Sequence, residues 1–255
     1  NHPAVLFWSH GNESGPGENF KAADDAVHAR DASRPTHYEG DWKASDVDSN
    51  MYPDVNGVWW HANQKDAKRP YYICEYAHNM INAMGNLKDY QDAIESSDVV
   101  IGGTIWDWVD QGLYKLNKDG VKIIGYGGDW GDKPNDGQFV MNGCILSDRA
   151  LEPAYWEIKH VFQPVSVTLD EGAETFTVFN KQYFRGLDVY DATWQLVLNG
   201  EVVQTEKLDL DAVGPRGRKT LPVPAAARAA VKAGTSVSVR VRFACRAQDG
   251  YLEKG

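Results

Sequence analysis

In the stretch Tyr71-Tyr72-Ile73-Cys74-Glu75-Tyr76-Ala77-His78, an apolar run of four residues leads to the carboxylate of Glu75. The first half of this stretch predicts a buried strand, with Glu75 at the carboxyl end. A helical pattern follows over residues 87–95, and the apolar residues 99–106 then predict another strand. Strands that alternate with helices are typical of a parallel sheet or an α/β barrel.

The same alternation extends to both sides of this stretch. Val5-Leu6-Phe7-Trp8 predicts an earlier strand, and residues 19–31 have the composition of a helix that stops before Ser33-Arg34-Pro35. Ile123-Ile124-Gly125-Tyr126 predicts a fourth strand of the series. The first part of the chain is therefore expected to be α/β.

Beyond Gln163-Pro164 the pattern changes to alternation with period two, and turns such as Asn199-Gly200 separate the runs. The runs cover residues 165–169, 175–179, 193–198 and 236–243. Regularly spaced strands of this kind predict an antiparallel β-sandwich. An alanine-rich stretch at residues 225–233 is too short to change that prediction. Two domains are expected, 1–163 and 164–255.

Composition excludes several classes of protein. The chain has 255 residues, is 42% hydrophobic and 24% charged, and carries a formal net charge of -10. Such a chain can bury a substantial core, and its acidic balance argues against a nucleic acid or an acidic membrane as partner. Nine Trp and 12 Tyr fit sugar stacking, although aromatic side chains also fill cores.

The sequence also lacks several recognisable features. No apolar run approaches the length of a transmembrane helix, and no signal peptide is visible. The three cysteines have no paired spacing, which predicts neither a zinc site nor a disulfide framework. The chain begins Asn1-His2-Pro3 without Met, so we expect it to be the interior of a longer protein, in the cytoplasm or a bacterial periplasm.

Two carboxylates follow predicted strands. Glu13 lies in Trp8-Ser9-His10-Gly11-Asn12-Glu13-Ser14, and Glu75 ends the strand described above. Side chains at the carboxyl ends of barrel strands line active sites. Hydrolysis of a glycosidic bond needs one protonated carboxyl group and one carboxylate, which this pair can supply. The alternative is that each Glu caps a helix or pairs with an arginine.

Five ordered segments resemble glycoside hydrolase family 2, in the version typical of its large β-galactosidases. The first two, residues 8–15 and 74–78, are similar to the acid/base and nucleophile signatures. The others are Ile105-Trp106-Asp107-Trp108-Val109-Asp110-Gln111, Tyr126-Gly127-Gly128-Asp129 and Gln138-Phe139-Val140-Met141-Asn142-Gly143.

The resemblance implies a fold and a function in carbohydrate metabolism. The fold is a partial (β/α)₈ TIM barrel, about strands 4–8, followed by an immunoglobulin-like β-sandwich. The activity is that of a retaining β-galactosidase that releases terminal β-D-galactosyl residues by double displacement. The full-length protein is expected to be a homo-oligomer, and its aglycone and linkage preference stay open.

The resemblance also assigns roles to matching residues. Glu13 is the general acid/base and Glu75 the nucleophile. Tyr52 hydrogen-bonds the nucleophile, Asn12 contacts the 2-hydroxyl, and His78 binds sugar hydroxyls. Each of these three has an ordinary structural alternative, as a loop tyrosine, a turn asparagine and a turn histidine.

Further assignments concern the sugar platform and the metal ions. Trp106 stacks on the galactose ring, unless its indole fills the barrel core. Glu13 is a ligand of Mg²⁺, while the Phe139 carbonyl and Asn142 hold Na⁺ near the 6-hydroxyl, against simple loop packing. The ligand sets of both ions are expected to be incomplete in this chain.

Some neighbouring polar residues are expected to have no catalytic role. His10 stands where such enzymes often carry a small or apolar residue, and we expect a hydrogen bond within its loop. Cys74 is expected to be a buried strand cysteine, and Glu39 and Asp41 a solvated surface or rim pair. Asp107 and Asp110 are expected to form ion pairs within the barrel.

The resemblance leaves two alternatives and one departure from the family pattern. A β-glucuronidase or β-mannosidase shares the same acid/base logic, and a non-catalytic carbohydrate-binding fragment would keep the Glu pair as a relic. In the family, a jelly-roll domain, an immunoglobulin-like domain and the first barrel strands precede the segment that matches this chain. We therefore expect these 255 residues to be inactive without that part.

Overall fold

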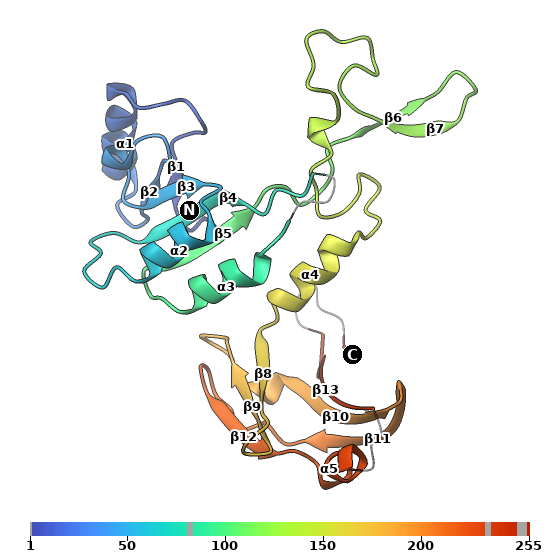
Figure 1. Cartoon of the computed structure of the whole chain (residues 1–255). Helices are drawn as coiled ribbons and strands as arrows, with labels where there is room; N and C mark the ends of the chain where they lie inside the picture. Colours follow the sequence, from blue (N-terminus) through green and yellow to red (C-terminus); the bar gives the residue numbers. More distant parts are fainter. Residues whose placement is uncertain (1, 81–83, 233–235, 249–253) are drawn as a thin grey trace. The chain divides into compact units, whose positions relative to one another are not determined.

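The computed structural model describes residues 2–80, 84–232, 236–248 and 254–255. The chain divides into two compact units, Asn1–Phe162 and Gln163–Gly255 (Figure 1).

Unit 1 is built on parallel strands that follow one another in chain order. β1 (Trp8–Ser9) pairs with β2 (Thr36–His37), and a parallel bridge from His37 to Val47 leads to β3 (Asp48–Met51). β3 pairs with β4 (Tyr71–Tyr76), and β4 with β5 (Val100–Ile105). Parallel pairing in chain order is the arrangement of a (β/α) barrel, and the described strands form part of one rather than a closed ring.

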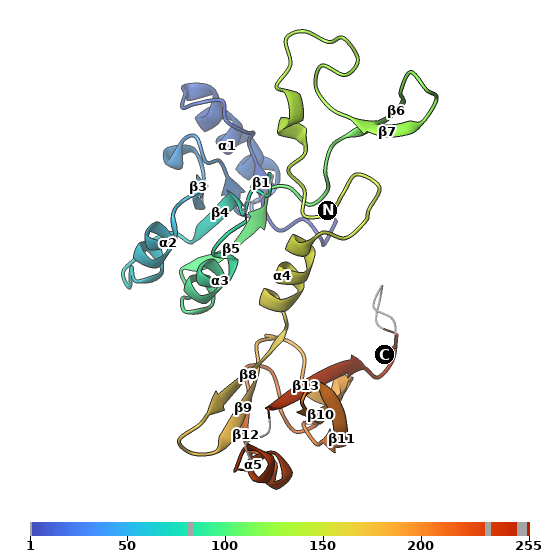
Figure 2. The ribbon, with the colours of Figure 1, turned by 45° about the vertical axis from the view of Figure 1, so that its right-hand side comes forward.

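Helices connect these strands. They are α1 (Glu18–Arg30), α2 (Val55–Ala62), α3 (Leu87–Glu95) and α4 (Pro153–Val161), with 3₁₀ turns η1 (Trp42–Ala44) and η2 (Gly137–Val140). The Asp54 carboxylate caps α2 by accepting from the Gly57 N–H at 2.6 Å, and Pro153 occupies the first turn of α4. α2 and α3 pack side by side next to β5 (Figure 2).

The core of unit 1 lies between this sheet and its helices. It includes Tyr71 and Ile73 of β4, Val58 of α2 and Ile158 of α4, and Cys144 joins it from far along the sequence. β4 is the most buried strand of the sheet because neighbouring strands cover both of its edges. Glu75 therefore lies on the central, most buried strand of this sheet.

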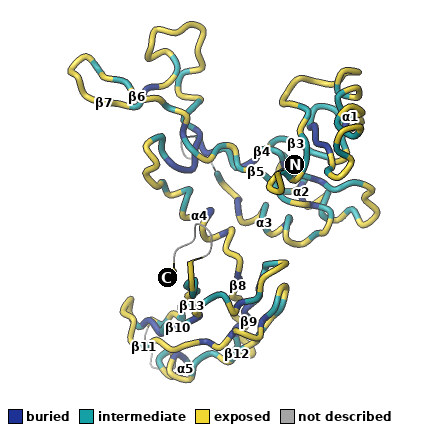
Figure 3. The backbone as a smooth tube through the Cα atoms, turned by 180° about the vertical axis from the view of Figure 1, so that it is seen from behind, coloured by how far each residue is buried: buried dark blue, intermediate teal, exposed yellow. Residues whose placement is uncertain are grey.

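The strand predicted at residues 123–126 is confirmed as a strand, but its expected place in the parallel series is wrong. Residues 122–125 form β7 (Lys122–Gly125), which pairs antiparallel with β6 (Leu113–Leu116) as a separate hairpin. The tight turn between them explains this, because the Asn117 side chain accepts from the N–H groups of Asp119 and Val121, and Gly120 has φ 76°. The hairpin is largely exposed (Figure 3).

Unit 2 consists of two three-stranded antiparallel sheets in its described residues, with orders β11-β10-β13 and β12-β9-β8. The strands are β8 (Val165–Asp170), β9 (Thr175–Asn180), β10 (Tyr190–Leu198), β11 (Glu201–Leu208), β12 (Arg218–Pro222) and β13 (Val237–Cys245). The inner faces meet around Val178, Leu196 and Trp194. This is a β-sandwich, as predicted.

The four predicted strands of unit 2 are confirmed as β8, β9, β10 and β13. Asn199 and Gly200 join β10 to β11 with φ of 49° and 90°, as a tight hairpin with a right-handed twist requires. The alanine-rich segment forms α5 (Ala225–Lys232), and a 3₁₀ turn, η3 (Leu187–Val189), precedes β10. No helix within the described residues is long and apolar enough to cross a membrane.

Candidate active site

The two candidate catalytic residues lie at the carboxyl ends of parallel strands. Glu13 is exposed in the loop after β1, and Glu75 is half-buried near the end of β4. Asn12 and Glu75 line the same hollow, whose volume is about 370 Å³. Its wall is completed by Phe7, Ser9, Gly11, His37, Glu39, Tyr72 and Cys74.

Tyr52 is bound to Glu75 through both its side chain and its backbone. Its hydroxyl donates to Glu75 Oε2 at 2.8 Å, and its N–H donates to the Glu75 carbonyl at 2.8 Å. Tyr52 follows β3, which pairs with β4, so the sheet register brings the two residues together. Burial and the hydrogen bond to Glu75 raise the pKa of Tyr52, and the negative charge of Glu13 adds to that shift. The hydroxyl therefore stays protonated as a donor through the neutral range.

His78 and Phe139 extend this group through aromatic contacts. The His78 ring lies 6.0 Å from the Tyr52 ring and 5.7 Å from the Phe139 ring, measured between centroids. His78 Nε2 is buried and has no hydrogen-bond partner among the described residues. A ring nitrogen left in this way is suited to a ligand hydroxyl.

Trp106 and Asn142 are connected through Asp107, the residue that follows Trp106. Trp106 follows β5 and is 38% exposed, so a face of its indole is open to contact. The N–H of Asp107 donates to the Asn142 carbonyl at 3.2 Å. Asn142 is 2% exposed, and its side-chain oxygen has no donor among the described residues.

Glu39, expected as a solvated surface or rim residue, is intermediate in exposure and belongs to the wall of the site. It lines the hollow, and its Oε1 accepts from the Glu13 N–H at 3.1 Å. Glu39 follows β2 as Glu13 follows β1, so convergence of strand ends explains its place. The sequence contains an indication of this position, because Glu39 comes directly after Thr36-His37-Tyr38, a short segment that begins after Pro35 and includes β2.

Other polar residues differ in part from expectation. Cys74 lies on β4 but is half-buried, and burial raises the pKa of its thiol, which keeps it a poor nucleophile. Asp107 and Asp110, for which ion pairs within the barrel were considered, accept hydrogen bonds from described residues. Asp110 accepts from the Gly143 N–H at 2.8 Å, and Asp107 accepts from the Gln111 amide at 2.7 Å.

The site can therefore present the Glu75 carboxylate, fixed by the phenol of Tyr52, and a second carboxyl group, that of Glu13, in the loop after β1. The second carboxyl group and the phenol come from residues with φ above zero, since Glu13 has φ 43° and Tyr52 has φ 47°. A pair of this kind can deliver a proton on one side of a bond and a nucleophile on the other.

The chain is similar to known proteins along most of its length. Residues 1–167 match the model for the TIM barrel domain of the glycosyl hydrolases of family 2, and residues 176–255 match domain 4 of β-galactosidase. A β-galactosidase of Priestia megaterium is 41% identical over 227 residues, and one of Leuconostoc mesenteroides is 38% identical over 230 residues. These alignments cover 87% and 83% of this chain and 22% of each relative.

Among solved structures, a family 2 β-galacturonidase of Eisenbergiella tayi aligns with a TM-score of 0.41 and 18% identity. That alignment covers 63% of this chain and 33% of the other. The family resemblance of the five motifs is confirmed by the match of the family model to all of unit 1. The chain belongs to glycosyl hydrolase family 2.

Proposed function

We propose that the chain is part of a retaining β-galactosidase that hydrolyses terminal β-D-galactosyl residues. The observation that carries the proposal is the Tyr52–Glu75 hydrogen bond beside a hollow that Asn12 also lines, with each of these residues at or just after the carboxyl end of a parallel strand. The relatives named β-galactosidase support the choice of sugar. Because the chain spans 22% of their length, the activity is that of a longer protein.

In the proposed mechanism Glu13 begins as the acid. It protonates the glycosidic oxygen while Glu75 attacks the anomeric carbon, so the bond to the leaving group breaks as the bond to Glu75 forms. Glu13 then removes a proton from water, and that water displaces Glu75. Two inversions give net retention, and this geometry requires the two carboxyl groups to be about 5–5.5 Å apart.

The surrounding residues would hold the sugar. Asn12, beside the acid/base, is placed to meet the 2-hydroxyl, where hydrogen bonds strengthen in the transition state. The open indole of Trp106 fits the apolar face of galactose, and the unpartnered His78 Nε2 fits a hydroxyl. Tyr52 holds Glu75 in place for attack and donates to it when it leaves.

The donor atoms fit the two expected cations unequally. For Na⁺, Asn142 offers a buried side-chain oxygen that no described donor satisfies, and the Phe139 carbonyl is the proposed second ligand. For Mg²⁺, Glu13 offers a carboxylate of suitable chemistry. The described residues contain no group of three His, Cys, Asp or Glu side chains that could hold a metal ion. No catalytic step is therefore assigned to Mg²⁺ here.

The two units would correspond to two domains of this enzyme. Residues 1–163 are proposed as the C-terminal half of the catalytic barrel, and residues 164–255 as the immunoglobulin-like domain after it. This assignment puts both catalytic carboxylates in the first domain.

Release of nitrophenol from aryl glycosides tests the proposal. The full-length protein and this chain are assayed side by side on the β-galactoside, with the β-glucuronide and the β-mannoside as controls. We expect the full-length protein to cleave the galactoside only, and Glu75→Gln to abolish turnover. Glu201→Gln, an exposed Glu on β11, serves as the matched control.

Two results would contradict the proposal in different ways. Cleavage of the glucuronide or mannoside instead of the galactoside would make the substrate wrong. Full activity of the Glu75→Gln variant would make the mechanism wrong.

A further inference from the structure

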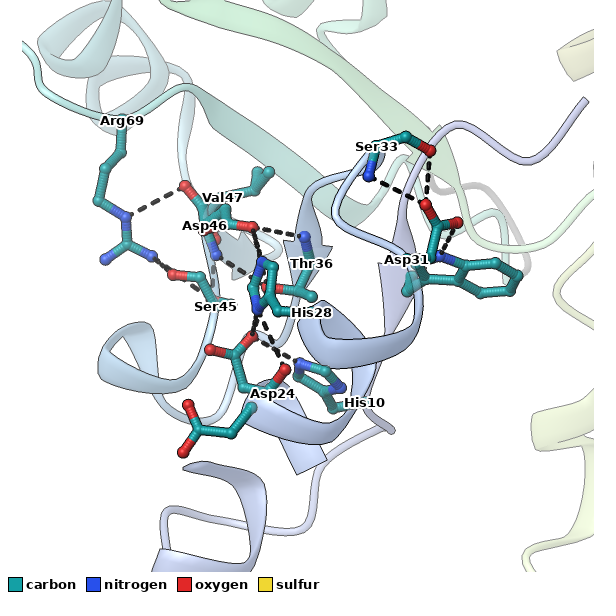
Figure 4. Close-up of polar contacts among 12 residues, drawn as sticks. His10, Asp24, His28, Asp31, Ser33, Thr36, Ser45, Asp46, Val47 and Arg69 are labelled. Atoms are coloured by element: carbon teal, nitrogen blue, oxygen red, sulfur yellow. Dashed lines mark hydrogen bonds and ion pairs between the residues drawn. The ribbon is translucent and has the colours of Figure 1, made fainter. Parts of the chain in front are cut away.

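A polar network connects the loop that carries Glu13 to helix α1. His10 lies three residues before Glu13, and its side chain is 2% exposed. Its Nε2 lies 3.2 Å from Oδ1 of Asp24 on α1, a carboxylate oxygen that accepts the hydrogen bond (Figure 4). The hydrogen bond expected for His10 is thus present, but it reaches out of the loop to a helix.

Asp24 is itself held in place from the neighbouring strand. The hydroxyl of Thr36, on β2, donates to Asp24 Oδ1 at 2.7 Å, and the Thr36 N–H donates to Asp46 Oδ2 at 2.9 Å. Thr36 is fully buried, so these bonds have little competition from water. His28, one turn after Asp24, lies against Asp46 Oδ2 at 2.9 Å and the Asp24 carbonyl at 3.0 Å (Figure 4).

The backbone of the same loop is held at both ends. The His10 N–H donates to the His37 carbonyl at 3.0 Å, and the Glu13 N–H donates to Glu39. Between these two bonds Gly11 has φ 147° and Glu13 has φ 43°. A non-glycine residue at positive φ is unfavourable and persists only where its surroundings hold it.

We propose that His10 and Asp24 are positioning residues for the general acid/base Glu13. The His10–Asp24 hydrogen bond, fixed by Thr36, holds the start of the loop and thereby sets where the Glu13 carboxyl group meets the glycosidic oxygen. This inference rests on the proposed function. Proton transfer requires hydrogen-bond distance in the reactive complex, and a displacement of about 1 Å can cost about a hundredfold in rate.

Positioning differs from simple stabilisation in how the rate depends on the leaving group. A phenolate leaves poorly and needs the proton from Glu13, whereas a 2,4-dinitrophenolate leaves without one. A misplaced acid therefore slows cleavage of phenyl β-galactoside much more than cleavage of the dinitrophenyl compound. Loss of fold stability lowers the amount of active enzyme and affects both substrates equally.

The experiment measures kcat/KM for both galactosides with the full-length protein and its variants. We expect His10→Leu and Asp24→Asn to lower the phenyl rate by about ten- to a hundredfold more than the dinitrophenyl rate. His10→Gln keeps an N–H near the position of Nε2 and should restore most of the phenyl rate. Asp25→Asn is the matched control, because Asp25 is the exposed neighbour of Asp24 on α1 and pairs with Lys21.

The outcomes separate this inference from the proposed function. Equal losses for both substrates in the His10 and Asp24 variants, or no loss for either, would overturn the positioning role. The proposed function would still stand in that case if the wild-type protein is active. If the wild-type protein cleaves neither galactoside, the proposed function is wrong and the positioning role falls with it. Thermal unfolding of each variant confirms that the compared proteins are folded.

Discussion

Replacing Tyr52 with phenylalanine removes one oxygen atom from the centre of the site. The ring and its contact with His78 remain, and so does the backbone bond from Tyr52 to the Glu75 carbonyl. The only described interaction removed with that oxygen is the 2.8 Å hydrogen bond from the hydroxyl to Glu75 Oε2. The substitution therefore isolates one contact to the proposed nucleophile.

The size of the effect follows from the charge of the acceptor. A hydrogen bond to a charged group contributes about 1.5–3 kcal/mol, which corresponds to a change of about 10- to 150-fold in rate if the contact acts in the transition state. We expect Tyr52→Phe to lower kcat/KM for nitrophenyl β-galactoside by this factor. Because burial and Glu75 raise the pKa of Tyr52, its hydroxyl donates at every pH from 6 to 9, and the factor should not change over that interval.

The assay compares initial rates of the full-length protein and its variants at several pH values, together with thermal unfolding. Tyr114→Phe is the control, because Tyr114 is an exposed tyrosine of the β6–β7 hairpin. A change of less than twofold for Tyr52→Phe would refute the role assigned to this hydrogen bond. A fall in activity that a lower melting temperature fully explains would refute it as well.

Three further substitutions test other parts of the structure. A Cβ at Gly143 would lie 2.0 Å from the backbone nitrogen of Asp110, so Gly143→Ala should cost about 1–3 kcal/mol or more, measured by urea unfolding of the chain. The hydrogen bond to Asp46 raises the pKa of His28 above 6.5, so its contribution to stability is complete below that pH and is lost as the pH rises through the folded pKa. His28→Gln should therefore lower the melting temperature at pH 5.5 and leave it nearly unchanged at pH 9. The loss of stability at pH 5.5 should be less than about 1 kcal/mol, because the pair is partly exposed. Leu196 is 3% exposed in the core of unit 2, so Leu196→Ala should cost about 2–5 kcal/mol, measured as faster hydrogen exchange within that unit.

Long periodic segments were predictable from the sequence. The helix expected over residues 87–95 is α3, with the same bounds. β10 and β13 were expected because apolar and polar residues alternate along them, and the Asn199-Gly200 turn between β10 and β11 was expected from its residue types. In each case a local pattern and the tertiary structure favour the same conformation.

Short elements were not predictable in this way. β3 consists of Asp48-Ser49-Asn50-Met51, which has no apolar alternation, and it is a strand because β4 pairs with it. α2 contains Gly57 and two adjacent tryptophans, which are weak helix formers, and its packing against α3 stabilises it. Tertiary contacts decide such segments, and a single sequence does not display them.

The candidate site likewise has some features that the sequence predicts and others that it does not. Glu13 and Glu75 are recognisable because each follows an apolar run and belongs to a motif. The bond from Glu13 to Glu39 and the path from His10 to Thr36 depend on distances between segments, which neither spacing nor composition encodes. The unpartnered His78 nitrogen is likewise a property of the folded molecule alone.

The left-handed backbone at Glu13, Tyr52 and Ala77 has a consequence for how this protein can be engineered. These residues stand on or beside the strand ends that carry the two carboxylates, with φ of 43°, 47° and 57°. Random mutagenesis scored only for thermostability would tend to select glycine at such positions, because glycine relieves the unfavourable torsion. At Glu13 and Tyr52 the gain in heat resistance would remove a side chain proposed for catalysis, whereas at Ala77 only a methyl group is lost. Ala77→Gly is therefore the thermostabilising change at this rim that a directed-evolution campaign could keep.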